Sequence, residues 1–470
     1  MKKNFLSSII LIILILTIHA DMQHNKIYAQ SNNIQIDNIS LPSVNSKTMN
    51  NGLRLLHIKD ELPRTIIILS TGFGKLYENN TNAGISDLIA KTLSLAGSKK
   101  YPAEVLHSTI ENIGGRFAVE SSFEETIIMI EVLEKYTTLA FDILKDIVEN
   151  PNIDTNIFEN AKSLIIESVR RKKDDPATLG FEKAREIIFN SSGYGSSATE
   201  KSLKSISKSD ALKVLENYFT ANNLIAGISS SLDYQNTLNE TKVFDTLKAG
   251  KRIDYNVDVK AISDTLAEKS AKIFLIPKDI PQATIVVGTV APNISDEKIY
   301  SLSLMNDILG GGSFNSRLMH EIRVKRGLAY AVQSIIKFRK NTGVFLAYAQ
   351  TRSESVDSTL SLMLDNIKKM SDSQVKDDEL KLAKNLIKNS YIFEFDTTIN
   401  ILKKYSFLSY NGLPVTFLLD YVKKIENIQK DVIQKNAGKL FTNGLVKIIV
   451  GNKDLEKKLS KFGSVIVLDK

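Results

Sequence analysis

The sequence predicts an α+β protein made of two copies of one domain, and three observations support this fold class. The chain has 470 residues, which is too long for one ordinary core. Strand-like and helix-like segments alternate along it from about Ile34. Their order then returns in the second half after roughly 220 residues, as it does when a domain is duplicated. Chance similarity between two α+β halves is the alternative explanation.

The first domain is expected over residues 34–232. Its strand-like segments are rich in Ile and Leu, and its helix-like segments carry apolar residues at helical spacing. Pro102 stands at the start of one of these helices, a position that proline favours. The expected strands are 53–59, 65–73, 116–121, 125–133 and 224–229, and the expected helices are 84–95, 103–112, 138–149, 157–173 and 212–219.

The second domain is expected over residues 265–470. A polar segment at 233–264, which has few apolar residues to anchor it, is the expected linker. Strand 342–349 resembles strand 116–121 of the first domain, and both halves end in a helix with a shared Phe-Thr pair. The other elements expected here are strands at 284–289 and 329–338 and helices at 315–325, 353–369 and 377–393.

The charge distribution and the absence of cysteine exclude several classes of function. The formal net charge is +8, but basic and acidic residues are mixed along the chain and no aromatic-basic module stands out. We therefore expect a lysine-rich solvated surface and no nucleic-acid partner. The chain has no cysteine, which excludes disulfides, thiolate zinc sites, a thiol nucleophile and a lipoprotein anchor.

The first residues have the pattern of a secretory signal peptide, which we place at residues 1–29. A basic start, Met1-Lys2-Lys3, precedes an apolar run from Ile9 to Ile18 that is too short for a comfortable membrane span of about 20 residues. An uncleaved anchor is the alternative. We expect an exported protein, periplasmic or secreted, without stable membrane insertion.

The run from Ile308 to Tyr330 holds the most informative pattern of the chain. Glycines 310–312 end a helical apolar pattern, and we expect them to allow a sharp turn through positive φ. Arg323 is expected in the last turn of the following helix and Tyr330 at the start of a strand, so their tips could converge. Alternatively, Arg323 caps its own helix and Tyr330 is a core aromatic.

With its flanking residues, GGGSFNSRL and KRGLAY, this run resembles the second-half signature of the insulinase/pitrilysin zinc peptidases, a family that includes the mitochondrial processing peptidases. The resemblance covers nearly the whole mature chain. It implies two α/β-sandwich domains, each a mainly antiparallel sheet with helices on one face, which form half of a clam-shell chamber. It also implies that Arg323 and Tyr330 donate hydrogen bonds to a peptide substrate near the scissile bond.

The zinc motif of that family is degenerate in this chain. The catalytic half carries H-x-x-E-H on its first long helix, where two His bind zinc and the Glu is the general base. Here Asp87 and Lys91 stand at the His positions and Ala90 at the Glu position. The third ligand, a Glu, aligns with Ser168, or with Glu167 if the alignment shifts by one residue. Alanine cannot move a proton and lysine brings an ammonium group, so we expect this chain to bind no zinc.

The family holds its peptide as an added strand on a sheet edge of the catalytic half. In this chain that edge would be strand 116–121, where Ala118-Val119 replaces the Asn-Ala pair usual in the family. This departure counts against peptide binding at that edge. No other residue set forms a metal or nucleophile motif, since His320-Glu321 lacks a second His at Val324.

These residues lead to one hypothesis and two alternatives. We expect a non-catalytic, substrate-binding subunit of an exported heterodimeric zinc peptidase that degrades or processes short unfolded peptides. A partner subunit with an intact H-x-x-E-H would hold the zinc, and this chain would supply Arg323 and Tyr330. The alternatives are a peptide-binding or scaffold protein with no enzymatic partner, and a divergent metallopeptidase that works alone.

Overall fold

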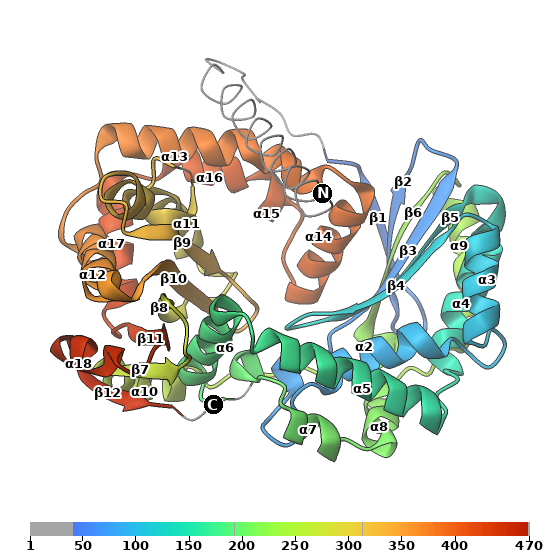
Figure 1. Ribbon diagram of the computed structural model, residues 1–470. Coiled ribbons are helices and arrows are strands. Elements are labelled where there is room, and N and C mark those ends of the chain that lie inside the picture. The colour runs from blue at the N-terminus through green and yellow to red at the C-terminus, as the bar shows by residue number, and fades with distance from the viewer. Residues whose placement is uncertain (1–40, 192, 313, 469–470) are drawn as a thin grey trace, which may run out of the picture.

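A computed structural model describes residues 41–191, 193–312 and 314–468 of the chain (Figure 1). The expected signal peptide at 1–29 lies outside these residues. Among the helices that the structure does describe, none has both the length and the apolar character needed to cross a membrane.

The first half contains a six-stranded sheet in the order β1-β2-β6-β3-β5-β4. Every neighbouring pair is antiparallel except β2 and β6, which are parallel. β4 lies at the edge of the sheet, as expected for strand 116–121. The strands are β1 (Val44–Thr48), β2 (Arg54–Lys59), β3 (Arg64–Thr71), β4 (Arg116–Ser121), β5 (Thr126–Leu133) and β6 (Leu224–Ser230).

The second half repeats this sheet in the order β12-β7-β11-β8-β10-β9. Here β7 runs parallel to both of its neighbours, and the remaining pairs are antiparallel. Five strands therefore recur in the same order and sense, which confirms two homologous domains with mainly antiparallel sheets. The strands are β7 (Lys272–Pro277), β8 (Gln282–Ala291), β9 (Ala329–Lys337), β10 (Gly343–Arg352), β11 (Val446–Gly451) and β12 (Ser464–Val467).

This order corrects one pairing of the two halves. The sequence comparison matched strand 342–349 with strand 116–121, but the sheet positions match β10 with β5 and β9 with β4. In both halves the edge strand comes first in the chain and the inner strand second. Resemblance between single strands did not establish their positions in the two sheets.

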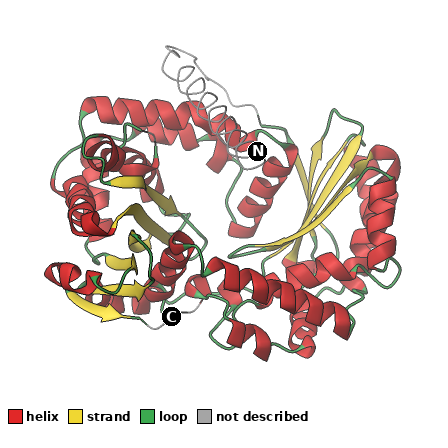
Figure 2. Ribbon diagram, in the orientation of Figure 1, coloured by secondary structure: helices red, strands yellow, loops and turns green. Residues whose placement is uncertain are grey.

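Helices cover the sheets in layers (Figure 2). In the first half they are α2 (Ile85–Ala96), α3 (Ala103–Asn112), α4 (Thr137–Glu149), α5 (Thr155–Lys172), α6 (Pro176–Ile188), α7 (Glu200–Ser205), α8 (Lys208–Tyr218) and α9 (Tyr234–Thr241). Those that follow are α10 (Val259–Ser270), α11 (Lys298–Asn306), α12 (Val356–Asp372), α13 (Asp377–Ser390), α14 (Thr398–Asn411), α15 (Thr416–Leu419), α16 (Tyr421–Asn427), α17 (Lys430–Phe441) and α18 (Leu455–Leu459).

The two halves exchange helices, which the sequence did not predict. α14 of the second half packs on the first sheet, where Leu402 and Leu408 meet Ile66 and Ile68 of β3. α6 of the first half packs in turn on β8 and β11 of the second sheet (Figure 1). Gly180 allows this close approach, because a Cβ there would lie 3.0 Å from Val286 Cγ2. Each sheet thus has helices of its own half on one face and a helix from the other half on the opposite face, where α10 lies beside α6 on the second sheet.

This exchange explains the composition of β3. Its residues 66–69 are four consecutive apolar residues, and all of them are fully buried. Alternate side chains of a strand point to opposite faces, so a run without polar alternation requires cover on both sides. Ile67 and Leu69 face the helices of the first half, and Ile66 and Ile68 face α14.

Part of the segment expected to link the halves, 233–264, belongs to the first domain. It contains α9 and the short 3₁₀ helix Lys242–Thr246, and Phe244 is fully buried in the first core. α10 then begins at Val259 and packs on the second sheet. Residues 248–258 form the irregular connection.

The glycine run does not turn through positive φ as expected. α11 continues into a π-helical segment, η6 (Asp307–Gly311), and none of the glycines 310–312 has a positive φ. Their small size is needed for another reason. A Cβ on Gly310 would lie 2.7 Å from the backbone nitrogen of Ser334, and a Cβ on Gly311 would lie 2.1 Å from Asn306 Nδ2. The helix expected at 315–325 is also largely π-helical, as η7 (Met319–Val324).

Candidate functional site

Arg323 and Tyr330 lie on two elements that pack against each other, η7 and β9. Gly327, with φ of +61°, makes the turn between them. Both side chains are exposed, Tyr330 to 55%. In the described part of the chain, no hydrogen bond or ring contact joins them. The structure therefore brings their elements together and leaves both polar groups facing outward, so Tyr330 is not a core aromatic.

Tyr330 is the extra residue of a β-bulge. β9 pairs regularly with β10 until Ala331 lies opposite Gln350, and the next pair is Ala329 with Thr351. Tyr330 has no partner in this register. A bulge redirects the side chain of the extra residue and twists the strand end. The bulge thus explains why Tyr330 is exposed although its neighbours Ala329 and Ala331 both pair with β10.

Arg323 has no carboxylate partner among the described residues. Its guanidinium group lies 5.8 Å from the ring centre of Phe314, itself 55% exposed, and Nη1 lies 4.0 Å from Met319 Sδ. By contrast, the nearby Arg326 forms an ion pair with Glu321 at 2.5 Å. The charge of Arg323 remains available to an anionic or carbonyl group of a ligand.

The helix that aligns with the family zinc helix is α2. Ala90 is buried, Lys91 is half-buried, and Asp87 lies in the first turn with its side chain 24% exposed. Lys75 Nζ lies 3.0 Å from the Asp87 carboxylate, so a cation of the same chain occupies one side of that carboxylate. A zinc ion would have to displace this ammonium group, and its other ligands would have to come from residues outside positions 87, 90 and 91.

The position expected for the third ligand lies on α5, which packs against α2 as the alignment requires. Ser168 is half-buried on this helix, and Glu167 is exposed. Within the described ranges, no group of three or more His, Asp or Glu residues is arranged to hold a metal ion. The donor set at 87–91 and 168 consists of one paired carboxylate, one methyl group, one ammonium and one hydroxyl. These groups do not fit zinc.

One buried carboxylate near α2 escaped the sequence analysis. Glu78 accepts hydrogen bonds from the backbone nitrogens of Gly84 and Ser86, at 2.9 and 3.0 Å, and from the Ser86 and Ser196 hydroxyls. It thereby satisfies donors at the start of α2 that the helix cannot satisfy itself. Burial raises the pKa of Glu78. The residue acts as the remote N-cap that holds this helix in place.

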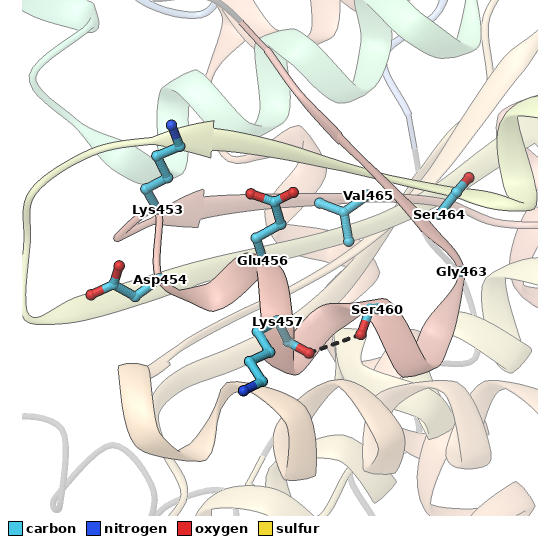
Figure 3. A pocket seen from close by; sticks show the side chains of 8 residues that line it. All are labelled: Lys453, Asp454, Glu456, Lys457, Ser460, Gly463, Ser464 and Val465. Atoms are coloured by element: carbon cyan, nitrogen blue, oxygen red, sulfur yellow. Dashed lines mark hydrogen bonds between the residues drawn. The ribbon is translucent and has the colours of Figure 1, made fainter.

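A surface hollow between α18 and β12 carries no site (Figure 3). Its charged residues Lys453, Asp454, Glu456 and Lys457 are all exposed, and the two signs of charge balance. The one hydrogen bond drawn there joins the Ser460 hydroxyl to the Lys457 carbonyl within the same turn. None of the described residues that line this hollow is a buried polar group that could recognise a ligand.

Two family models match this chain in succession. "Insulinase (Peptidase family M16)" matches residues 57–200, and "Peptidase M16 inactive domain" matches residues 205–387. Together they cover more than half of the chain. The chain belongs to the insulinase family, peptidase family M16. The predicted resemblance to the insulinase/pitrilysin family is confirmed.

Relatives within the M16 family carry contrasting names. An "Uncharacterized zinc protease" of Rickettsia felis is 27% identical over 87% of this chain and 98% of its own length. A "Non-peptidase homolog YmxG" of Helicobacter pylori is 26% identical over 84% of this chain and 91% of its own. Similarity to these proteins thus supports membership of the M16 family but does not assign an activity to this chain.

Solved structures support the M16 fold. A peptidase M16 inactive domain from Pseudomonas fluorescens matches with a TM-score of 0.78 and 20% identity, over 87% of this chain and 98% of the other. A protease from Helicobacter pylori also gives 0.78, with 16% identity, over 88% of this chain and all of the other. At such identities these matches establish the architecture of two homologous domains.

Proposed function

We propose that this chain is a non-catalytic, substrate-binding subunit of an exported heterodimeric M16 peptidase. A partner with an intact H-x-x-E-H would hold the zinc and cut short unfolded peptides. This chain would close the other side of the chamber and place Arg323 and Tyr330 against the peptide backbone near the bond to be cut.

The observation that carries this proposal is the contrast between the two candidate sites. At α2 the Asp87 carboxylate is paired with Lys75, and neither Ala90 nor Lys91 supplies a ligand. At β9 a bulge exposes Tyr330, and Arg323 has no carboxylate partner among the described residues. Donors that are already aimed outward can stabilise charge on a ligand without rearranging. These sites lie in different halves of the chain (Figure 1).

Zinc content and peptide hydrolysis test the first part of this proposal. The chain is purified alone, and then together with an M16 protein of the same organism that has the complete motif. We expect less than a tenth of an equivalent of zinc in the lone chain and no hydrolysis, and hydrolysis in the mixture. One equivalent of zinc with hydrolysis by the lone chain would instead establish a peptidase that works alone.

Single substitutions test the second part. Arg323→Ala and Tyr330→Phe should each lower kcat/KM of the mixture by about tenfold to a hundredfold, the usual effect of losing a donor to developing charge. Arg326→Ala and Tyr255→Phe are matched controls, because Arg326 is paired with Glu321 and Tyr255 packs on Tyr77. The zinc content of the partner should not change in any variant.

Two outcomes would count against assistance to a partner. Equal activity of Arg323→Ala, Tyr330→Phe and their controls would remove the assigned roles. Peptide binding by the lone chain, without any hydrolysis in the mixture, would favour the binding or scaffold protein, a role compatible with the "non-peptidase" name of one relative.

A further inference from the structure

A cavity of about 260 Å³ lies between the end of η6, the loop that follows it and α13. It is separate from α2 and from the exposed face of Tyr330. Asp307 lines it from η6, Ser316 from the loop, and Asp378 from the first turn of α13. π-helical turns are rare and often occur at functional sites, and here η6 supplies one wall.

Asp307 is a half-buried carboxylate without a partner. No hydrogen bond or ion pair reaches its side chain within the described residues. Its neighbour on the cavity wall, Glu379, is fully satisfied, since Arg317 binds both of its oxygens at 2.7 Å. Burial raises the pKa of Asp307 to about 6. An unpaired carboxylate in such a place is unfavourable unless a cation joins it.

A second polar group is unsatisfied at the same cavity. Ser316 is only 4% exposed, and its hydroxyl oxygen has no hydrogen-bond partner. A buried hydroxyl without a partner is uncommon, because it loses its bonds to water and gains none in return. Ser316 lines the same cavity as Asp307.

Ile308, Leu382 and Leu386 form the apolar part of the cavity wall, and Asn315 adds an amide beside Ser316. No described group of three metal-binding side chains lies there, so a divalent ion would lack its ligands. A compact cation with several donors and a short hydrocarbon stem matches this combination of the unpaired Asp307 carboxylate, one hydroxyl and aliphatic side chains.

We propose that this cavity binds a primary ammonium group carried on an aliphatic stem, with Asp307 and Ser316 as its polar partners. The same chemistry occurs in a lysine side chain and in a free diamine. This site does not depend on a partner subunit or on zinc, and so it stands apart from the proposed peptidase role.

The charges around Asp307 define how binding should vary with pH. Asp378 and Glu379 face the cavity from α13, Arg317 is occupied by Glu379, and Tyr421 approaches from α16. None of these described groups offers Asp307 a free cation. Binding should therefore weaken by roughly tenfold between pH 7.5 and pH 5, as Asp307 takes up a proton.

The test uses the full mature chain in an amine-free buffer, with butylamine as the probe and 1-butanol as its neutral match. Binding is followed by ligand-observed NMR and calorimetry. We expect butylamine to bind at least about tenfold more tightly than butanol, Asp307→Asn to remove that preference, and Ser316→Ala to reduce it by a smaller factor. Asp372→Asn, on the far end of α12 and paired with Lys368, is the control.

Further ligands separate the two sources of the amine. A lysine-containing pentapeptide is compared with its norleucine analogue, and both with 1,4-diaminobutane. If the lysine peptide binds more tightly than butylamine, the lysine side chain is the ligand. If 1,4-diaminobutane binds more tightly, the free diamine is the ligand. Equal binding of butylamine and butanol, or unchanged binding by folded Asp307→Asn, would overturn the proposal.

Discussion

Lys75 Nζ lies 3.0 Å from the carboxylate of Asp87, and each side chain is 24% exposed. This ion pair joins the 3₁₀ turn Lys75–Tyr77 to the first turn of α2. Asp87 is the residue that we align with the first zinc-binding histidine of the family. Lys75 also lies 5.8 Å from the ring centre of Phe123, in the β4–β5 loop. Asp87 and Lys75 thus have a structural role in this chain.

Restoring the motif should restore metal binding. The variant Asp87→His, Ala90→Glu, Lys91→His and Ser168→Glu should bind close to one equivalent of zinc, because α2 and α5 still pack together. Zinc content is measured by mass spectrometry after dialysis, with the unaltered chain expected near zero.

A matched triple variant tests which residue of α5 aligns with the third zinc ligand. The triple variant carries Asp87→His, Ala90→Glu and Lys91→His but keeps Ser168. At positions 167 and 168 its only carboxylate is the native Glu167, which is exposed. If the alignment on Ser168 is correct, the triple variant should bind zinc at least about tenfold more weakly than the quadruple one. Equal affinity would mean that Glu167 is the ligand, and our alignment would be wrong by one residue.

The exchanged helix α14 should support the stability of the first half. Leu408 is buried against the first sheet although it belongs to the second half. Leu408→Ala should lower the free energy of unfolding by about 2–5 kcal/mol. Leu164→Ala, at an exposed position on α5, should change it by less than about 0.5 kcal/mol.

Hydrogen exchange shows where the Leu408 substitution acts. Since α14 covers β3 and β6, faster exchange should spread through those strands in the first half. Faster exchange confined to the second half would contradict the exchange of helices.

Two glycines should respond in opposite directions to a methyl group. Gly310→Ala places a Cβ 2.7 Å from a backbone nitrogen of β9, and should cost about 1–3 kcal/mol of stability. Gly438 lies within α17 with open space around it, so Gly438→Ala should add about 0.5–1 kcal/mol. Thermal unfolding measures both, and a tolerated Gly310→Ala would contradict the close packing of η6 on β9.

Stability should depend on pH through Asp307. Its pKa in the folded chain, about 6, is above the ordinary value of 3.8. The folded state therefore binds more protons than the unfolded state between about pH 4 and 6, and stability falls as pH rises through this range. Asp307→Asn should become more stable than the unaltered chain by about 2–3 kcal/mol above pH 6 and equal to it near pH 4. Urea unfolding at several pH values measures the difference, and a difference that does not vary with pH would contradict the burial of this carboxylate.

Sequence reasoning predicted the duplication, most strands and the two candidate sites, because hydrophobic periodicity and a local motif are encoded over short distances. It did not predict α6 or α14. Their local signals are present, since Asp175 caps α6 with Pro176 after it and Thr397 caps α14. Which sheet each helix covers depends on contacts between distant segments. The hydrophobic pattern of a helix does not identify the sheet on which it packs.

The site shows the same division between local and distant causes. Arg323 and Tyr330 were identified by their spacing, but the bulge at Tyr330 depends on pairing with β10, which is set by another strand. The glycines 310–312 were assigned to positive φ because sequence alone does not separate that need from close approach to Ser334. The cavity at Asp307 depends on α13, which follows about 70 residues later along the chain.

The reciprocal helix exchange sets an order of events during synthesis. The strands of the first sheet are all made once the ribosome has passed Ser230, yet one face of that sheet stays bare until α14 emerges, starting at Thr398. At about 5–20 residues per second this takes many seconds. A nascent chain of this protein therefore presents an isoleucine-rich surface for that whole interval, and should be a client for chaperones until its C-terminal third is released.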